Sequence, residues 1–181
     1  ELFMKSTLLF LFIFVLSPNI ILANTPYVKK NACPFECCLY GKWTAKSPIK
    51  IYQKERNASD QSIVQSLKPG DTFTAIKGNV YTDVLGSVEM TQDHLQFKKG
   101  DTVFILLSLG EGFFEVKHLN KTYEVEAFWS GGGVLVGKKR EKAKFINKEK
   151  TDWWVFIKTQ SGKTGWIKMN DVKIRGADGC G

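Results

Sequence analysis

Short runs of alternating hydrophobic and polar residues fill the chain from Leu39 onward, and Gly, Asn, Asp or Pro separates most of them. β-Branched and aromatic residues dominate these runs, a composition typical of β-strands. No stretch keeps a helical period with capping residues over about ten positions, and residues 139–150 are predicted to form one helical turn at most. We therefore predict an all-β protein with strands at residues 42–45, 49–53, 62–67, 72–76, 79–82, 86–90, 102–109, 113–119, 122–128, 134–137, 153–158 and 165–169.

Two of the predicted strands follow the same turn sequence. Lys-x-Gly-Asp-Thr occurs at residues 68–72 and again at residues 98–102, and each copy precedes an apolar run. Glycine adopts a positive φ at no steric cost, and aspartate can bond to its own backbone two residues on, so each copy predicts a turn that leads into a strand. The pattern fits either an internal duplication or two hairpins that use the same turn.

Three consecutive glycines at residues 131–133 interrupt the strand pattern, because glycine weakens a strand interior. We place a domain boundary there, between a first β unit at residues 39–128 and a C-terminal unit at residues 129–181. A unit of about 50 residues buries too small a share of its surface to be stable alone. The two units are therefore expected to pack together.

A predicted hairpin at residues 150–172 contains three tryptophans. The residues between its two strands are Gln160, Ser161 and Gly162, which suit a type I turn closed by a glycine in the left-handed conformation. A loop of this length sets the register of the hairpin. It places Phe156 opposite Trp166, and Trp154 opposite Lys168.

Side chains alternate between the two faces of each strand of this hairpin. One face carries Trp153, Val155, Ile157 and Ile167 and is predicted to lie in the core. Lysine is seldom fully buried, so the face that contains lysines is expected to leave Trp154 and Trp166 at least partly exposed. The side chains on that second face are Trp154, Phe156, Lys158, Trp166 and Lys168.

The sequence WWVFIKTQSGKTGWIKMNDV at residues 153–172 resembles the second half of a bacterial SH3-like domain, and GDTFTAI at residues 70–76 resembles the strand after the diverging turn of that family. The resemblance implies one or two small, partly open barrels of about five strands. It also implies a non-catalytic module that binds cell-envelope peptides or glycans, or other domains, through surface aromatic residues. The positions that match the family's contact residues are Trp154 and Trp166, and the predicted ligand-binding patch adds their neighbours Phe156, Lys158 and Lys168. Alternatively, these rings only cover a thin barrel.

The N-terminal residues predict a cleaved signal peptide. Lys5 precedes the apolar run at residues 6–17, and a small residue, Ala23, ends the segment, which gives residues 1–23 as the leader. The alternative is an uncleaved membrane anchor, but Pro18 and Asn19 interrupt a run that would need about 20 apolar residues to span a bilayer. The mature protein is therefore expected to be periplasmic or extracellular, beginning with an irregular cysteine-containing segment at residues 24–38.

The four cysteines of an exported protein favour two disulfides. Vicinal Cys37 and Cys38 are unsuited to bonding with each other, so each is expected to pair elsewhere. Cys33 would pair with one of them, and Cys180 with the other, which ties the start of the folded region to its end. A metal site is the alternative for this cysteine cluster.

The formal net charge is +8, from 26 basic and 18 acidic residues. Such a charge draws an exported protein toward anionic wall polymers, lipid headgroups or acidic glycans, although it also serves solubility alone. Nucleic acid is not an expected partner for a protein that leaves the cytoplasm. No cofactor is expected.

No residue pattern indicates catalysis. A cysteine hydrolase would need a free thiol beside His94 or His118. A glycosidase would need a pair of carboxylates, for which Glu111 with Glu115 and Glu124 with Glu126 are the candidates, although an amphipathic strand carries such residues as well. We expect a binding module and no enzyme. An interaction or inhibitor module for another exported protein is the main alternative, with a cysteine hydrolase after it.

Overall fold

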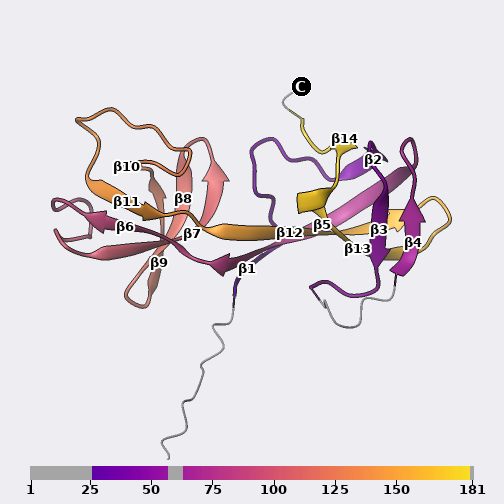
Figure 1. Ribbon diagram of the computed structural model, residues 1–181, viewed down its shortest axis with the longest axis horizontal. Coiled ribbons are helices and arrows are strands. Elements are labelled where there is room, and N and C mark those ends of the chain that lie inside the picture. Colours follow the sequence, from indigo (N-terminus) through magenta and orange to yellow (C-terminus); the bar gives the residue numbers. More distant parts are fainter. Residues whose placement is uncertain (1–25, 57–62, 180–181) are drawn as a thin grey trace, which may run out of the picture.

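The computed structural model describes residues 26–56 and 63–179 (Figure 1). Almost all of its regular structure is strand, which confirms the predicted all-β class. The strands form two curled sheets of eight and six strands. The predicted signal peptide at residues 1–23 lies outside the described residues. Within the described ranges, no helix is long and apolar enough to cross a membrane.

The eight-stranded sheet, here called the first lobe, is built from two separate parts of the chain. Its strand order is β14-β2-β5-β12-β13-β3-β4, and β1 pairs with β5 outside this path. Its elements are β1 (Tyr27–Lys30), β2 (Gly41–Ala45), β3 (Ile49–Tyr52), β4 (Ile63–Leu67), β5 (Thr72–Val84), β12 (Lys150–Thr159), β13 (Thr164–Lys168), the 3-10 helix η1 (Met169–Asp171) and β14 (Ile174–Arg175).

The six-stranded sheet, here called the second lobe, is inserted between β5 and β12 of the first lobe. The long strands β5 and β12 run side by side toward it (Figure 1). Its strand order is β10-β11-β6-β7-β8-β9. Its elements are β6 (Gly86–Met90), β7 (Thr102–Gly110), β8 (Phe113–His118), β9 (Lys121–Glu126), β10 (Trp129–Ser130) and β11 (Ala143–Asn147).

The two sheets do not correspond to the expected units at residues 39–128 and 129–181. β10 and β11, on either side of the glycine run, pair with each other, and β11 also pairs with β6, so this segment completes the second lobe. The glycines serve close packing there: a Cβ at Gly131 or Gly132 would lie 2.8 or 2.7 Å from the Phe145 side chain. The glycine run therefore belongs to a packed loop within the second lobe.

Several strand boundaries differ from the expected ones. The runs predicted at residues 72–76 and 79–82 form one continuous strand, β5. The run at residues 134–137 makes only an isolated bridge, whereas residues 143–147 form β11. Residues 27–30, in the segment expected to be irregular, form β1 because the long β5 offers them an edge to pair with. In each case pairing with a distant strand overrides the local pattern.

The two Lys-x-Gly-Asp-Thr copies adopt the same turn. Asp71 Oδ2 accepts a hydrogen bond from the backbone N–H of Lys68 at 2.8 Å, and Asp101 Oδ2 accepts one from Lys98 at 2.8 Å. The intervening glycines have φ values of 96° and 89°. The Gly70 N–H donates to the carbonyl of Ala45, the last residue of β2, at 2.9 Å. The Gly100 N–H donates to the carbonyl of Met90, the last residue of β6, at 2.8 Å.

Beyond this turn, the two lobes repeat one strand arrangement. The order β14-β2-β5-β12-β13 in the first lobe corresponds to β11-β6-β7-β8-β9 in the second, and every neighbouring pair is antiparallel. The second lobe lacks counterparts of the β3–β4 hairpin, which in the first lobe lies between β2 and the shared turn. The common order favours duplication over the coincidental use of one turn.

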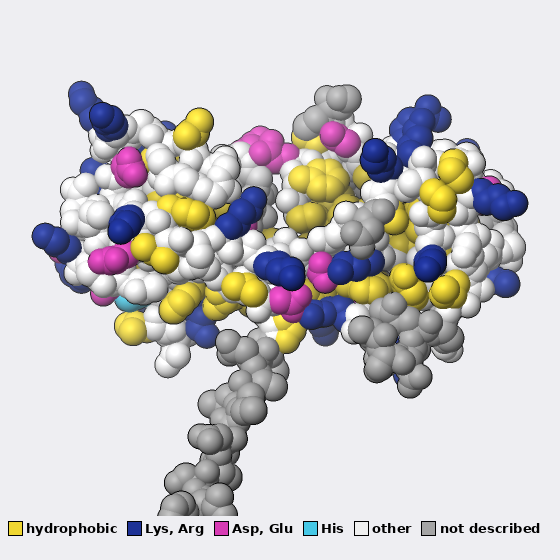
Figure 2. Space-filling view, viewed as in Figure 1, with side chains coloured by type: hydrophobic (Ala, Val, Ile, Leu, Met, Phe, Trp, Pro, Cys, Tyr) yellow, Lys and Arg dark blue, Asp and Glu magenta, His cyan; other side chains and the backbone are white. Residues whose placement is uncertain are grey.

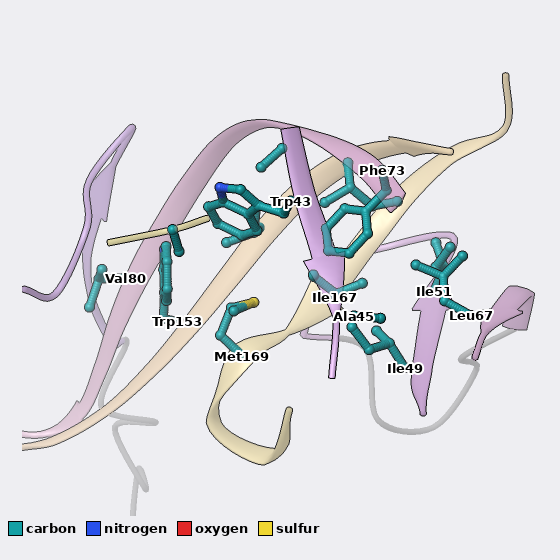
Figure 3. Close-up of a cluster of buried hydrophobic side chains, with 14 of the residues drawn as sticks. Trp43, Ala45, Ile49, Ile51, Leu67, Phe73, Val80, Trp153, Ile167 and Met169 are labelled. Carbon is teal, nitrogen blue, oxygen red and sulfur yellow. The ribbon is translucent and has the colours of Figure 1, made fainter. Parts of the chain in front are cut away.

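Each lobe has its own hydrophobic core, and the two cores meet. Leu106 and Leu107 of β7 are buried in the core of the first lobe, and the Thr82 hydroxyl donates to the Leu106 carbonyl at 2.5 Å. The predicted core face of the hairpin is confirmed, since Trp153, Val155, Ile157 and Ile167 are all buried. Figure 3 shows part of the first-lobe core, which includes Trp43, Ala45, Ile49, Ile51, Leu67, Phe73, Val80, Trp153, Ile167 and Met169.

The cysteine-containing segment contacts both lobes: its strand β1 pairs with β5 of the first, and Lys29 pairs with Glu115 of the second. Cys33 and Cys38 form the local disulfide, one of the two local pairings expected. Cys37 is also disulfide-bonded, while Cys180, the predicted end of the long bridge, lies outside the described residues. The same part of the chain reaches the second lobe, because Lys29 Nζ lies 2.9 Å from Glu115 Oε2.

Candidate functional site

The tryptophan hairpin has the register predicted from its loop. Phe156 pairs with Trp166, and Trp154 pairs with Lys168. Gly162 has a φ of 83°, in the left-handed region, and the N–H of Gly162 donates to the carbonyl of Thr159 at 3.0 Å. Local turn chemistry therefore decides which side chains share the outer face of β12 and β13.

Trp154 is buried at 3% exposure, so the expectation that it is partly exposed is wrong. The Tyr52 ring covers it from β3, edge-on, with the ring centroids 5.9 Å apart. The residues after β3 fold over the same face: Glu55 accepts a hydrogen bond from Asn79, which pairs with Trp154 across β5 and β12. The Trp154 Nε1 donor is buried without a hydrogen-bond partner among the described residues.

The other aromatic residues of this face remain accessible. Phe156 and Trp166 are half-buried, which confirms the expectation of partial exposure for Trp166. Their ring centroids lie 5.2 Å apart, and Lys77 Nζ of β5 lies 5.8 and 6.0 Å from the two centroids. Lys158 is exposed at the end of the same row. A partly exposed aromatic pair with cations beside it gives a large contact area at small rotamer cost.

A cleft of about 550 Å³ adjoins this aromatic pair. It lies between the β3–β4 hairpin and the outer face of β12 and β13, with Tyr52 and Trp154 in its wall. Lys168 Nζ lies 3.0 Å from Asp152 Oδ2 inside it. The residues that line the cleft are Pro48, Ile49, Lys50, Tyr52, Arg56, Ser66, Asp152, Trp154, Lys168 and Val172.

A polar network holds residues 55 and 56 at the rim of the cleft. Arg56 pairs with Asp83, and its guanidinium carbon lies 4.5 Å from the centroid of the Tyr81 ring. The Asn79 amide donates to Glu55 Oε2 at 2.8 Å. Burial, followed by the hydrogen bond and negative charge of Glu55, raises the pKa of Tyr81 to about 12. The network therefore favours the neutral phenol.

The raised pKa of Tyr81 predicts a loss of stability at alkaline pH. The neutral phenol contributes stability that is fully present below the ordinary tyrosine pKa of 10.0, and that is lost as the pH rises toward the folded-state value of about 12. We expect the free energy of unfolding in urea to fall over this interval. Tyr81→Phe should show a smaller fall, and an identical pH profile for both proteins would exclude this contribution.

The candidate catalytic residues lie apart from the cleft. His118 Nε2 is 3.2 Å from Asp101 Oδ2, and the His94 ring packs edge-on against Phe128, both in the second lobe. Glu124 and Glu126 occupy one outer face of β9, as expected for an amphipathic strand. No described cysteine is free, and within residues 26–56 and 63–179 no three His, Cys, Asp or Glu side chains are grouped to hold a metal.

Sequence reasoning missed the half of the cleft that comes from the β3–β4 hairpin. Tyr52, Lys50 and Arg56 contribute to the cleft from a segment about 100 residues before the tryptophans. Asp152 lies in the hairpin itself, but its role depends on Lys168, which pairs with Trp154, two residues further along the same face. The single usable signal was the alternation in residues 49–53, which puts Lys50 and Tyr52 on one side of a strand.

No family model, curated protein or solved structure matches the chain. The interpretation of the site therefore depends on its geometry and chemistry.

Proposed function

We propose that the chain is an exported, non-catalytic binding module that recognises a cell-envelope peptide or glycan through the outer face of β12 and β13. The observation that carries the proposal is the combination of the cleft walled by Tyr52 and Trp154 with the adjoining half-buried pair Phe156 and Trp166. Concave sites with aromatic walls and a few convergent polar groups are the usual form of ligand sites.

The strand arrangement supports an SH3-like identity for the first lobe. Five neighbouring strands of its sheet, in the order β14-β2-β5-β12-β13, form a small curled unit. The β12–β13 hairpin, which carries the family-like sequence, comes directly before β14, the last strand along the chain. The β3–β4 hairpin continues the sheet beyond β13 and completes the cleft. We extend the proposal to the second lobe, which has the same order without the hairpin.

Truncation of one ring of the half-buried aromatic pair is the test of this proposal. Trp166→Ala should lower retention on purified cell-wall material by about tenfold or more, because interface aromatics commonly account for most of the binding energy. Trp166 is half-buried on the outer face, so the fold is expected to persist. Retention is measured as the bound fraction at several wall concentrations, with near-UV circular dichroism as the folding check.

Phe113→Ala is the matched control for this test. Phe113 of β8 is 40% exposed and occupies the position in the second lobe that corresponds to Trp154, so its removal takes away an aromatic ring outside the proposed site. Its retention should equal that of the wild type. Absence of wild-type retention, or equal retention of folded Trp166→Ala, would contradict the proposal. Co-purification with one exported protein in place of wall binding would favour an interaction module.

A further inference from the structure

We propose that the cleft of the first lobe recognises a carboxylate of a peptide ligand through Lys50 and Lys168, beside the positive charge of Arg56 at the rim. This inference rests on the proposed binding function and adds the chemical class of the group that enters the cleft. Three basic side chains line the cleft, and two acidic side chains pair with them: Asp152 with Lys168, and Asp83 with Arg56, which leaves Lys50 as the excess positive charge. A confined site with this excess of positive charge favours an anionic group over a neutral one.

The basic side chains keep donors that their protein partners do not use. The Lys168 ammonium pairs with one carboxylate, that of Asp152, and an ammonium group has three N–H donors. Arg56 donates to Asp83 through Nη2, whereas its Nη1 is buried with no hydrogen-bond partner among the described residues. Lys50 is exposed, and no described residue forms an ion pair with it. The donor capacity that a ligand can reach therefore lies at Lys50 and Lys168, whereas Arg56 contributes its charge at the rim.

The positive charge of the protein is concentrated in the lobe that contains the cleft. Residues 26–85 and 148–179 hold 16 Lys and Arg against 9 Asp and Glu, a net charge of +7. Residues 86–147, the second lobe, hold 9 basic against 8 acidic residues, a net charge of +1. In Figure 2, basic side chains surround exposed hydrophobic side chains on the first lobe. An anionic partner is thus directed toward the first lobe.

The corresponding faces of the two lobes differ in charge. The hairpin pairs Trp154–Lys168 and Phe156–Trp166 of the first lobe correspond to cross-strand pairs of β8 and β9 in the second. Those second-lobe pairs are Phe113–Glu126 and Glu115–Glu124. The same strand arrangement thus presents aromatic and basic residues on one lobe, and one aromatic residue with three acidic residues on the other. The difference follows from side-chain identity alone, and it makes the first lobe the one that favours an anionic ligand.

The walls of the cleft favour a peptide carboxylate over a phosphate polymer. Tyr52, Trp154, Ile49 and Val172 give the cleft apolar surface beside its cations. An extended polyanion would instead need a basic track along the surface, since each of its charges requires a cation. A carboxylate with an apolar side chain next to it matches both kinds of surface in the cleft.

The experiment uses the full chain and insoluble peptidoglycan, whose stem peptides carry free carboxylates, before and after chemical amidation of those carboxylates. Amidation should lower retention by about tenfold, because it replaces charge-assisted hydrogen bonds with neutral ones. Lys50→Gln, at an exposed position, should lower retention on the native material and have little further effect on the amidated material. Lys168→Gln should behave alike, provided its near-UV spectrum is unchanged.

Lys121→Gln is the matched control, because it removes one exposed positive charge from the second lobe. Its retention should equal that of the wild type. An equal loss in Lys121→Gln and Lys50→Gln would show diffuse attraction and overturn the proposal. Equal retention on native and amidated material would also overturn it, and would leave the proposed function intact where Trp166→Ala still loses retention. No retention on either material would refute the proposed function itself.

Discussion

Trp43→Ala is expected to lower the free energy of unfolding by about 3–5 kcal/mol, the range for large-to-small changes at buried aromatic positions. Trp43 is 0% exposed, and its ring contacts those of Tyr40, Phe73 and Trp153 at centroid distances of 6.0 Å. Its Nε1 donates to the Leu39 carbonyl at 2.8 Å. The substitution would remove these contacts and leave both a cavity and an unpaired carbonyl.

The loss is large because of where β2 lies in the first lobe. β2 pairs with β5 on one side and β14 on the other. The Trp43 ring contacts Tyr40, which precedes β2, and Trp153 of the hairpin, whose ring lies beside it in the core (Figure 3). A small domain has only about 5–15 kcal/mol of total stability, so the variant would lose a large fraction of it. Denaturant unfolding followed by far-UV circular dichroism measures the change.

Phe113→Ala again provides the comparison for Trp43→Ala, because Phe113 is an exposed aromatic on β8. It should change the free energy of unfolding by about 1 kcal/mol or less, since little surface is removed from the interior. If the two variants had the same unfolding midpoint, Trp43 would not be a central part of the core.

The hairpin was predictable because its determinants are local. A three-residue loop with Gly162 in the left-handed conformation sets the register, and alternation then assigns Val155, Ile157 and Ile167 to the core. The same argument places Phe156 and Trp166 together on the outer face. Turn chemistry and strand periodicity both act within a few residues, so a single sequence contains them in full.

The burial of Trp154 was not predictable by the same reasoning. Strand alternation correctly assigns Trp154 to the outer face, but it does not show which other segment covers that face. Tyr52 and Glu55 do so from about 100 residues earlier in the chain. A distant cover of this kind depends on tertiary packing, which overrides an estimate of exposure made from one hairpin.

The insertion of one lobe into the other was hidden for a related reason. The glycine run at residues 131–133 has the composition of a linker, but its small size instead allows close contact with Phe145 of β11. β11 itself, at residues 143–147, lies between lysine-rich segments and shows little alternation. The structural roles of the glycine run and of β11 depend on the pairing of β11 with the distant strand β6.

Gly165→Ala is expected to lower the free energy of unfolding by about 1–3 kcal/mol, the range for an overpacked site. A Cβ at Gly165 would lie 2.6 Å from Ile51 Cγ2 and 2.6 Å from the backbone oxygen of Tyr52. The backbone oxygen has no rotamer by which to move aside, so β3 itself must shift away from β13. Denaturant unfolding measures the cost.

The same shift should impair ligand binding, because β3 carries Tyr52 and Lys50 in the wall of the cleft. Among the described residues a single pair, Trp166 with Tyr52, aligns β13 with β3, so little backbone pairing resists the displacement. Gly137→Ala is the control, since a Cβ there meets no atom within 4 Å and its φ is not positive. Equal stability and equal wall retention for the two alanine variants would mean that β3 is not held in place by its close contact with Gly165. A selective loss in Gly165→Ala would instead link the glycine of the Thr-Gly-Trp sequence directly to the geometry of the cleft.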